Sequence, residues 1–291
     1  MRISVRRPPL IAVGGVGLLT LSEVHFSSMS QPAPQAPTPA TPSPSAIAVA
    51  IPWHKVVEDL EPYIVRLSTP GGWGTGFFLA HSAGGMVSAI ATAAHVVEHA
   101  HLWEDPIRIH HPTSGASLVV RHNERAIRID ARTDTAVIVV RRDRVALPAA
   151  ALNLTPKGMH LTVGNDIGWL GFPAIPVADL CFFSGRVSAW SPSLDAYLVD
   201  GNAINGVSGG PAVSVVAGAL FLVGVVSAYA PNRATGESLP GLAIVRSVER
   251  FHDEVAAITS FDEAKAQETP PEPPTDLPPA EPSGTPTRSR P

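Results

Sequence analysis

Short runs of apolar and β-branched residues recur along the middle of the chain, separated by Gly, Pro, Asn and Asp. Runs of about four to eight such residues between turn residues are typical of β-strands. The segments that fit are 64–67, 76–79, 86–91, 118–122, 126–130, 136–140, 168–170, 183–190, 196–199, 212–216, 220–227 and 242–245. A linker around 148–156 divides them into two sets. We therefore expect an all-β protein built of two packed antiparallel six-stranded β-barrels.

Two segments have a helical pattern instead. The first, 53–60, has an apolar face and ends before Pro62, while the second, 248–258, has an apolar stripe and follows Ser247, a residue type that favours helix N-caps. The residues on these two faces are Trp53, Val56, Val57, Leu60, Val248, Phe251, Val255 and Ile258. We expect short helices at both ends of the folded unit.

Proline-rich stretches flank this unit, which we place at residues 51–258. Residues 31–50 are interpreted as a Pro-rich linker and residues 259–291 as a disordered Pro-rich tail, because both lack an apolar period. The N-terminal barrel is expected at about 62–147 and the C-terminal barrel at about 157–246.

Residues 1–30 resemble a targeting segment. Arg2, Arg6 and Arg7 precede the apolar run 10–21, and small residues follow at 28–30. The run would rise roughly 18 Å as a helix, short of the roughly 30 Å hydrocarbon core of a membrane. A signal peptide is thus expected, and with it a secreted protein or one of the periplasm or cell envelope. Membrane contact is expected only if the segment stays uncleaved as an anchor.

The chain of 291 residues can bury a sizeable core, and its net charge of −4 gives no reason to expect nucleic-acid binding. Cys181 is the only cysteine, so an intrachain disulfide is impossible. Its apolar surroundings predict an inert, buried thiol.

Three short motifs carry candidate chemistry. His95 ends a small-residue strand within Thr92-Ala93-Ala94-His95, and Asp134 stands at the mouth of the apolar strand 136–140. Ser208 lies in Gly206-Val207-Ser208-Gly209-Gly210-Pro211, where glycines permit a sharp turn that aims the N–H groups of Gly206 and Ser208 to one side. Each motif alone is compatible with a structural role, but together they supply a nucleophile, a base and its carboxylate partner.

The order His, Asp, Ser and these motifs resemble the chymotrypsin-like serine peptidases, and most closely the protease domain of the bacterial Deg/HtrA type. Further pieces of the resemblance are Gly74-Thr75-Gly76-Phe77 and Gly168-Trp169-Leu170-Gly171-Phe172-Pro173. The resemblance covers roughly residues 56–248 and implies the chymotrypsin fold. Val207 departs from it, because Asn or Asp is expected there. We also expect no PDZ domain, since the residues after Ile258 are proline-rich.

The resemblance implies a serine endopeptidase acting on proteins or peptides, with a catalytic triad of His95, Asp134 and Ser208 and an oxyanion hole made by the N–H groups of Gly206 and Ser208. The substrate cleft would be lined by Asn202, Val226, Ser227 and Ala228. Asn202 would form the floor of the specificity pocket. This chemistry requires neither a cofactor nor a metal ion.

Two alternatives stay open. A catalytically inactive protease fold could serve as a binding protein. A zinc protease is the other, because His95, Glu98 and His99 fit the His-x-x-Glu-His pattern. That pattern needs a long helix, and Pro106 would close the available window.

Overall fold

A computed structural model describes residues 51–176, 179–231, 236 and 238–268. The predicted targeting segment 1–30, the linker 31–50 and the part of the predicted tail from 269 onward lie outside the described residues. Within the described part of the chain, no helix has the length and apolar character that crossing a membrane takes.

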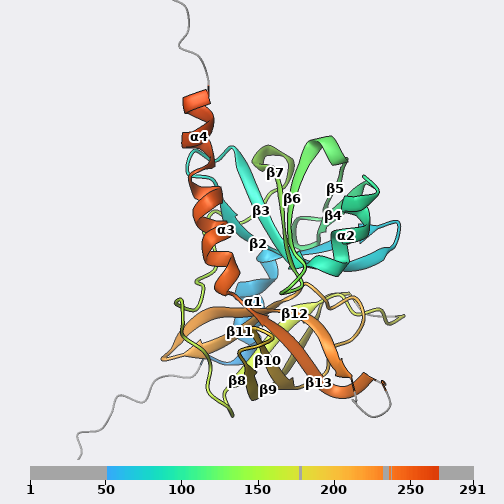
Figure 1. Cartoon of the computed structure of the whole chain (residues 1–291), viewed down its shortest axis with the longest axis vertical. Helices are drawn as coiled ribbons and strands as arrows, with labels where there is room; N and C mark the ends of the chain where they lie inside the picture. The colour runs from blue at the N-terminus through green and yellow to red at the C-terminus, as the bar shows by residue number, and fades with distance from the viewer. Residues whose placement is uncertain (1–50, 177–178, 232–235, 237, 269–291) are drawn as a thin grey trace, which may run out of the picture. The chain divides into compact units, whose positions relative to one another are not determined.

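Among the described residues, thirteen strands form two antiparallel sheets, shown in Figure 1. The first sheet has the order β5-β4-β1-β2-β3-β7-β6, and the second is a closed barrel of the order β10-β13-β12-β11-β8-β9. The strands of the first sheet are β1 Ile64–Thr69, β2 Gly72–His81, β3 Val87–Ala93, β4 Ile107–His111, β5 Ala116–Val120, β6 Arg125–Asp130 and β7 Thr135–Arg141. Those of the barrel are β8 Asp166–Gly171, β9 Cys181–Ser191, β10 Ala196–Asp200, β11 Pro211–Val216, β12 Ala219–Pro231 and β13 Ser238–Ser247.

The all-β class and the six-stranded C-terminal barrel agree with the prediction, while the N-terminal half differs from it. It is a curled sheet of seven strands rather than a second closed six-stranded barrel, with β5 and β6 at its two edges. The guanidinium of Arg125 donates to the carbonyl oxygen of Val120, the last residue of β5, and also to those of Ala100 and Asp105. This side chain thus connects the end of β5 with the start of β6. Strand β4 escaped prediction because its five residues lie directly after Pro106.

Four α-helices complete the described fold: α1 Trp53–Leu60, α2 Ala94–Leu102, α3 Glu249–Thr259 and α4 Phe261–Glu268. Helices α1 and α3 lie where the apolar stripes predicted them. Ser247 accepts a hydrogen bond from the N–H of Glu249 but sits one residue before the N-cap, Val248. Helix α4 corrects the prediction of a disordered tail from 259, because Ala, Glu, Lys and Gln favour a helix and the prolines begin only at Pro270.

The hydrophobic core joins the two halves. One cluster of buried residues combines Leu60 of α1, Phe77 of β2, Leu170 of β8 and Phe251 of α3. The rings of Phe77 and Phe251 meet edge to face, with centroids 6.2 Å apart. Helix α3 therefore follows the last strand of the barrel yet packs on the N-terminal sheet, as Figure 1 shows.

Candidate active site

His95 is the second residue of helix α2, directly after a strand whose seven residues are all buried. Small residues predominate at the end of that strand, so it lies close between β2 and β7. The helix begins at Ala94, where the strand ends, and turns the His95 side chain toward solvent, leaving 49% of it exposed.

Asp134 ends the four-residue turn that joins β6 to β7. Strand β7 pairs with β3 so that Thr135 faces Ala93, and the N–H of Ala94 donates to the carbonyl oxygen of Asp134 across 3.1 Å. Asp134 itself has a φ of 50°, a left-handed conformation that is uncommon for a residue with a side chain. This register and turn place Asp134 beside His95.

The carboxylate of Asp134 holds the His95 ring. Nδ1 of His95 lies 2.9 Å from Oδ2 and 3.1 Å from Oδ1, and the His95 N–H donates to Oδ1 across 3.1 Å. The hydroxyl of Ser227 also donates to Oδ2, across 2.5 Å. Burial raises the pKa of Asp134, but the hydrogen bonds from His95 and Ser227 outweigh it and leave the pKa below its ordinary value. Asp134 is therefore ionised at neutral pH, and Nε2 of His95 is left free to accept a proton.

The Ser208 loop is shaped by two glycines in the left-handed region. Gly206 has a φ of 91° and is the third residue of a turn closed by a 3.0 Å bond from the Val207 N–H to the Ile204 carbonyl. A positive φ at this place is what a type II turn requires. Gly209, with a φ of 87°, leaves no room for a side chain, because a Cβ there would lie 2.0 Å from the carbonyl oxygen of Thr75.

Thr75 anchors this loop from the N-terminal sheet. Its hydroxyl donates to the Gly206 carbonyl across 2.8 Å, and its N–H donates to the Ser208 carbonyl across 2.8 Å. The Gly74-Thr75-Gly76-Phe77 motif thus joins the two halves of the site, and Gly74 is small because Val96 and the Ser208 carbonyl crowd it.

The N–H groups of Gly206 and Ser208 have no hydrogen-bond acceptor among the residues that the structure describes. Both belong to the loop that carries the Ser208 hydroxyl. The hydroxyl itself donates to the carbonyl oxygen of Ser227 across 3.2 Å. Ser208 and His95 therefore line the same hollows without a direct bond between their side chains.

Two hollows flank His95 and Ser208. One, of about 290 Å³, is also lined by Ala203, Ile204, Asn205, Ser227, Ala228 and Tyr229. The other, of about 250 Å³, is also lined by Thr69, Gly71, Gly72, Trp73, Val96, His99, Asn205 and Gly206. Together they form a cleft that runs past the candidate nucleophile on both sides, as an extended polypeptide would need.

The predicted substrate-binding residues divide into two groups. Ser227 and Ala228 line the first hollow. Asn202 and Val226 do not: Asn202 is exposed on the far side of the loop, near Gly241, and Val226 is buried in the barrel core. Counting residues back from Ser208 cannot follow the path of the loop, which places Ile204 and Asn205 in the hollow instead.

Sequence reasoning missed Asn205, Tyr229 and Trp73. The Tyr229 hydroxyl donates to the side-chain oxygen of Asn205 across 3.2 Å at the wall of the first hollow. Trp73 lies under the guanidinium of Arg66, with 5.0 Å between Cζ and the ring centroid, and is 44% exposed. A tryptophan directly before the Gly-Thr-Gly-Phe motif was the one available signal in the sequence.

The two histidines of the predicted zinc motif, His95 and His99, each face a different carboxylate. His95 and His99 share helix α2, but Nδ1 of His99 faces the carboxylate of Asp105 across 3.4 Å, while that of His95 faces Asp134. Within the described residues, no group of three or more His, Cys, Asp and Glu side chains could hold a metal ion.

Two other features of the sequence have a structural explanation. Val207 is fully buried in the barrel core and touches Gly171. Its side chain therefore supports the Ser208 loop from within the barrel and does not line the cleft. Cys181 is a free cysteine at the start of β9, only partly buried where a buried thiol was predicted, and it is not among the described residues that line the two hollows.

Comparison with known proteins identifies the class. Residues 74–225 match the trypsin-like peptidase domain, so the chain belongs to the trypsin-like peptidase family. Among solved structures, Deg5 shares 18% sequence identity at a TM-score of 0.53, covering 70% of this chain and 93% of that chain. Rv3671c of M. tuberculosis H37Rv shares 19% identity at a TM-score of 0.49, covering 70% and 89%. A comparison with curated proteins gave no match.

The likeness to Deg5 confirms the fold, a chymotrypsin-type arrangement of a closed barrel and a curled sheet. Family membership makes the protein a peptidase, whose substrates are proteins or peptides.

Proposed function

We propose that the protein is a serine endopeptidase in which Ser208 attacks the peptide carbonyl, His95 is the general base and Asp134 orients the imidazole. The observation that carries this proposal is the bond between the Asp134 carboxylate and Nδ1 of His95, at 2.9 Å. It fixes the tautomer that keeps Nε2 basic and stabilises the imidazolium that forms during attack.

The reaction would proceed in two halves. Ser208 Oγ forms a bond to the peptide carbonyl carbon while its proton passes to Nε2 of His95, which then delivers that proton to the leaving amine. The acyl group stays on Ser208 until a water molecule, deprotonated by the same histidine, releases it as a carboxylic acid. The open cleft on both sides of Ser208 favours an endopeptidase.

The oxyanion formed in each half would be held by the N–H groups of Gly206 and Ser208. In related enzymes, removal of one such donor costs about 3–4 kcal/mol of transition-state stabilisation. The left-handed Gly206 and the Thr75 anchor support this assignment, because they keep the donors in place without substrate.

Cleavage of an unfolded protein such as casein tests the proposal. Ser208→Ala and His95→Ala should each lower turnover by orders of magnitude, because the two side chains act as a unit. Ser193→Ala and His101→Ala are matched controls on exposed positions and should retain activity. A chelator should leave cleavage unchanged. Undiminished cleavage by Ser208→Ala, or loss of activity with the chelator, would contradict the proposal.

A further inference from the structure

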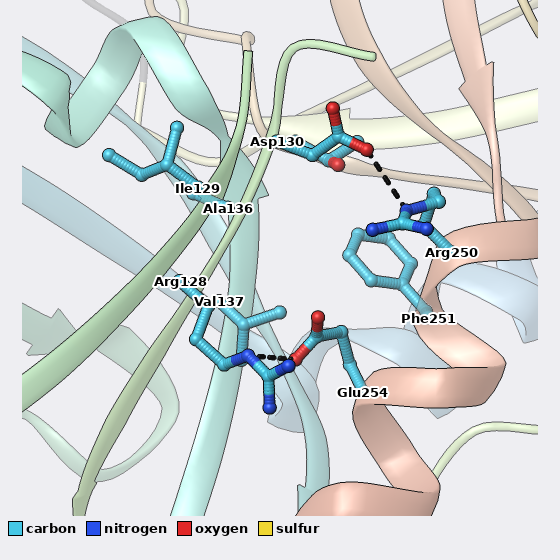
Figure 2. A pocket seen from close by; sticks show the side chains of 9 residues that line it. Arg128, Ile129, Asp130, Ala136, Val137, Arg250, Phe251 and Glu254 are labelled. Atoms are coloured by element: carbon cyan, nitrogen blue, oxygen red, sulfur yellow. Dashed lines mark ion pairs between the residues drawn. The ribbon is translucent and has the colours of Figure 1, made fainter. Parts of the chain in front are cut away.

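Helix α3 touches the hairpin that carries Asp134. Figure 2 shows the gap between the β6–β7 hairpin and this helix, a cavity of about 130 Å³ crossed by two ion pairs. Arg250 Nε lies 2.9 Å from Asp130 Oδ2, and Arg128 Nε lies 3.0 Å from Glu254 Oε2. Phe251 stands between them and anchors the helix in the core.

The two ion pairs differ in what they contact, because only the Arg250–Asp130 pair includes a residue that is hydrogen-bonded to the turn before Asp134. Oδ1 of Asp130 accepts the N–H groups of Arg132, at 3.0 Å, and of Thr133, at 3.3 Å. The other oxygen of the same carboxylate faces Arg250. Arg128, in contrast, lies two residues earlier on β6. Its partner Glu254 is not hydrogen-bonded to the turn 131–134 among the described residues.

The turn needs such support because Asp134 is held in a left-handed backbone conformation. A residue with a Cβ in that region costs of order 1 kcal/mol or more, and it persists only when its surroundings determine it. Asp130 fixes the first half of the turn, and the bond from Ala94 to the Asp134 carbonyl fixes its end.

Asp130 is also prepared for this role electrostatically. Burial raises its pKa, but the N–H groups of Thr133 and Arg132, the Thr133 hydroxyl and the charge of Arg250 outweigh burial and hold the pKa below its ordinary value. The carboxylate is thus ionised whenever the site operates near neutral pH.

We propose that Arg250 is a positioning residue, which fixes the turn that presents Asp134 to His95 by holding Asp130 from the C-terminal helix. The inference rests on the proposed triad and extends it to a residue that follows the barrel. Arg250 is not among the described residues that line the two hollows beside Ser208, so its effect would pass through Asp130 to the orientation of Asp134.

Steady-state cleavage of a peptide by the full-length chain tests the role. Arg250→Gln should lower kcat about tenfold with little change in KM, because a displacement of less than 1 Å in a catalytic group is costly. Asp130→Asn should have the same effect, since its amide oxygen can still accept the turn N–H groups. Arg250→Lys, which keeps the charge, should recover most of the loss. Arg128→Gln removes the other ion pair of the same interface and should stay within about twofold of wild type.

A second measurement separates positioning from catalysis. The Nδ1 proton of His95 should give a far-downfield NMR resonance that Arg250→Gln and Asp130→Asn weaken or shift and Arg128→Gln does not. The double variant Arg250→Gln/Asp130→Asn should be no worse than either single one, because both break one link.

Equal kcat values and unchanged His95 resonances in Arg250→Gln and Arg128→Gln would overturn the inference. If the wild type fails to cleave peptides at all, the proposed function fails, and the resonance alone still decides whether Arg250 positions Asp134.

Discussion

The hydroxyl of Ser208 donates a hydrogen bond to the carbonyl oxygen of Ser227, across 3.2 Å. For attack on a substrate, this hydroxyl must turn to Nε2 of His95. The bond that it leaves is a neutral one, worth about 1 kcal/mol, so the rotation costs less than a factor of ten in rate. The bonds from Thr75 to the Gly206 and Ser208 carbonyls hold the loop around this hydroxyl.

The protein should therefore be competent at rest. We expect a fluorophosphonate to react with the folded full-length chain at a rate that added peptides change by less than tenfold. Labelling kinetics with and without a peptide mixture measure this. A reaction that occurs only when peptide is present would show that the loop around Ser208 rearranges before it acts.

Ser227 is expected to tune the triad through its bond to Asp134. Ser227→Ala removes a donor to a charged oxygen, an interaction worth about 1.5–3 kcal/mol, and should lower kcat by about tenfold or more while raising the pKa of Asp134. Ser214→Ala is the matched control, because Ser214 is equally buried in the barrel and donates only to the carbonyl of Asp166. Equal kcat values for the two variants would contradict this role.

Acid should weaken the fold through Asp134. Its folded pKa lies below the ordinary value, so its ionised form contributes stability that is complete above about pH 4 and is lost as the pH falls through the folded pKa. The unfolding free energy of wild type relative to Asp134→Asn should decline as the pH drops from about 5 to about 3. Urea unfolding at both pH values measures the difference, and a constant difference would contradict the prediction.

Cleavage is expected after small or medium apolar residues. The described lining of the hollow beside Ser208 and Ser227 contains Ala203, Ile204 and Ala228 but no carboxylate, so a Lys or Arg side chain would be desolvated there without a counter-ion. A peptide library with one varied position should show this preference. Dominant cleavage after Lys or Arg would refute it.

The local parts of the site could be predicted from the sequence, because each lies in a short motif at a strand end. His95 follows a strand of small residues, Asp134 precedes an apolar strand and Ser208 lies between glycines. The distances between these three residues could not be predicted, because they depend on contacts between distant parts of the chain. Ala93 pairs with Thr135, and Thr75 holds the Ser208 loop through Gly206, 131 residues further along.

The incorrect predictions also concern features that depend on the path of the chain and on contacts between distant residues. Asn202 was assigned to the cleft by its separation from Ser208, but the turn at Ile204–Val207 carries it away. The contact of Arg250 with Asp130 joins residues that are far apart in the sequence, and no motif predicts it. The predicted closure of the first sheet was also wrong: β5 and β6 remain its two edges, and the Arg125 guanidinium at the start of β6 donates to the carbonyl oxygen of Val120 at the end of β5.

The central claim, that Ser208 is a nucleophile activated by His95, is tested most directly by mass analysis of the fluorophosphonate adduct. We expect the wild type to carry one adduct on the peptide that contains Ser208, with Ser193→Ala equally labelled, His95→Ala labelled orders of magnitude more slowly and Ser208→Ala unlabelled. A folded wild type that stays unmodified, or a Ser208→Ala variant that is modified at the wild-type rate, would contradict the account.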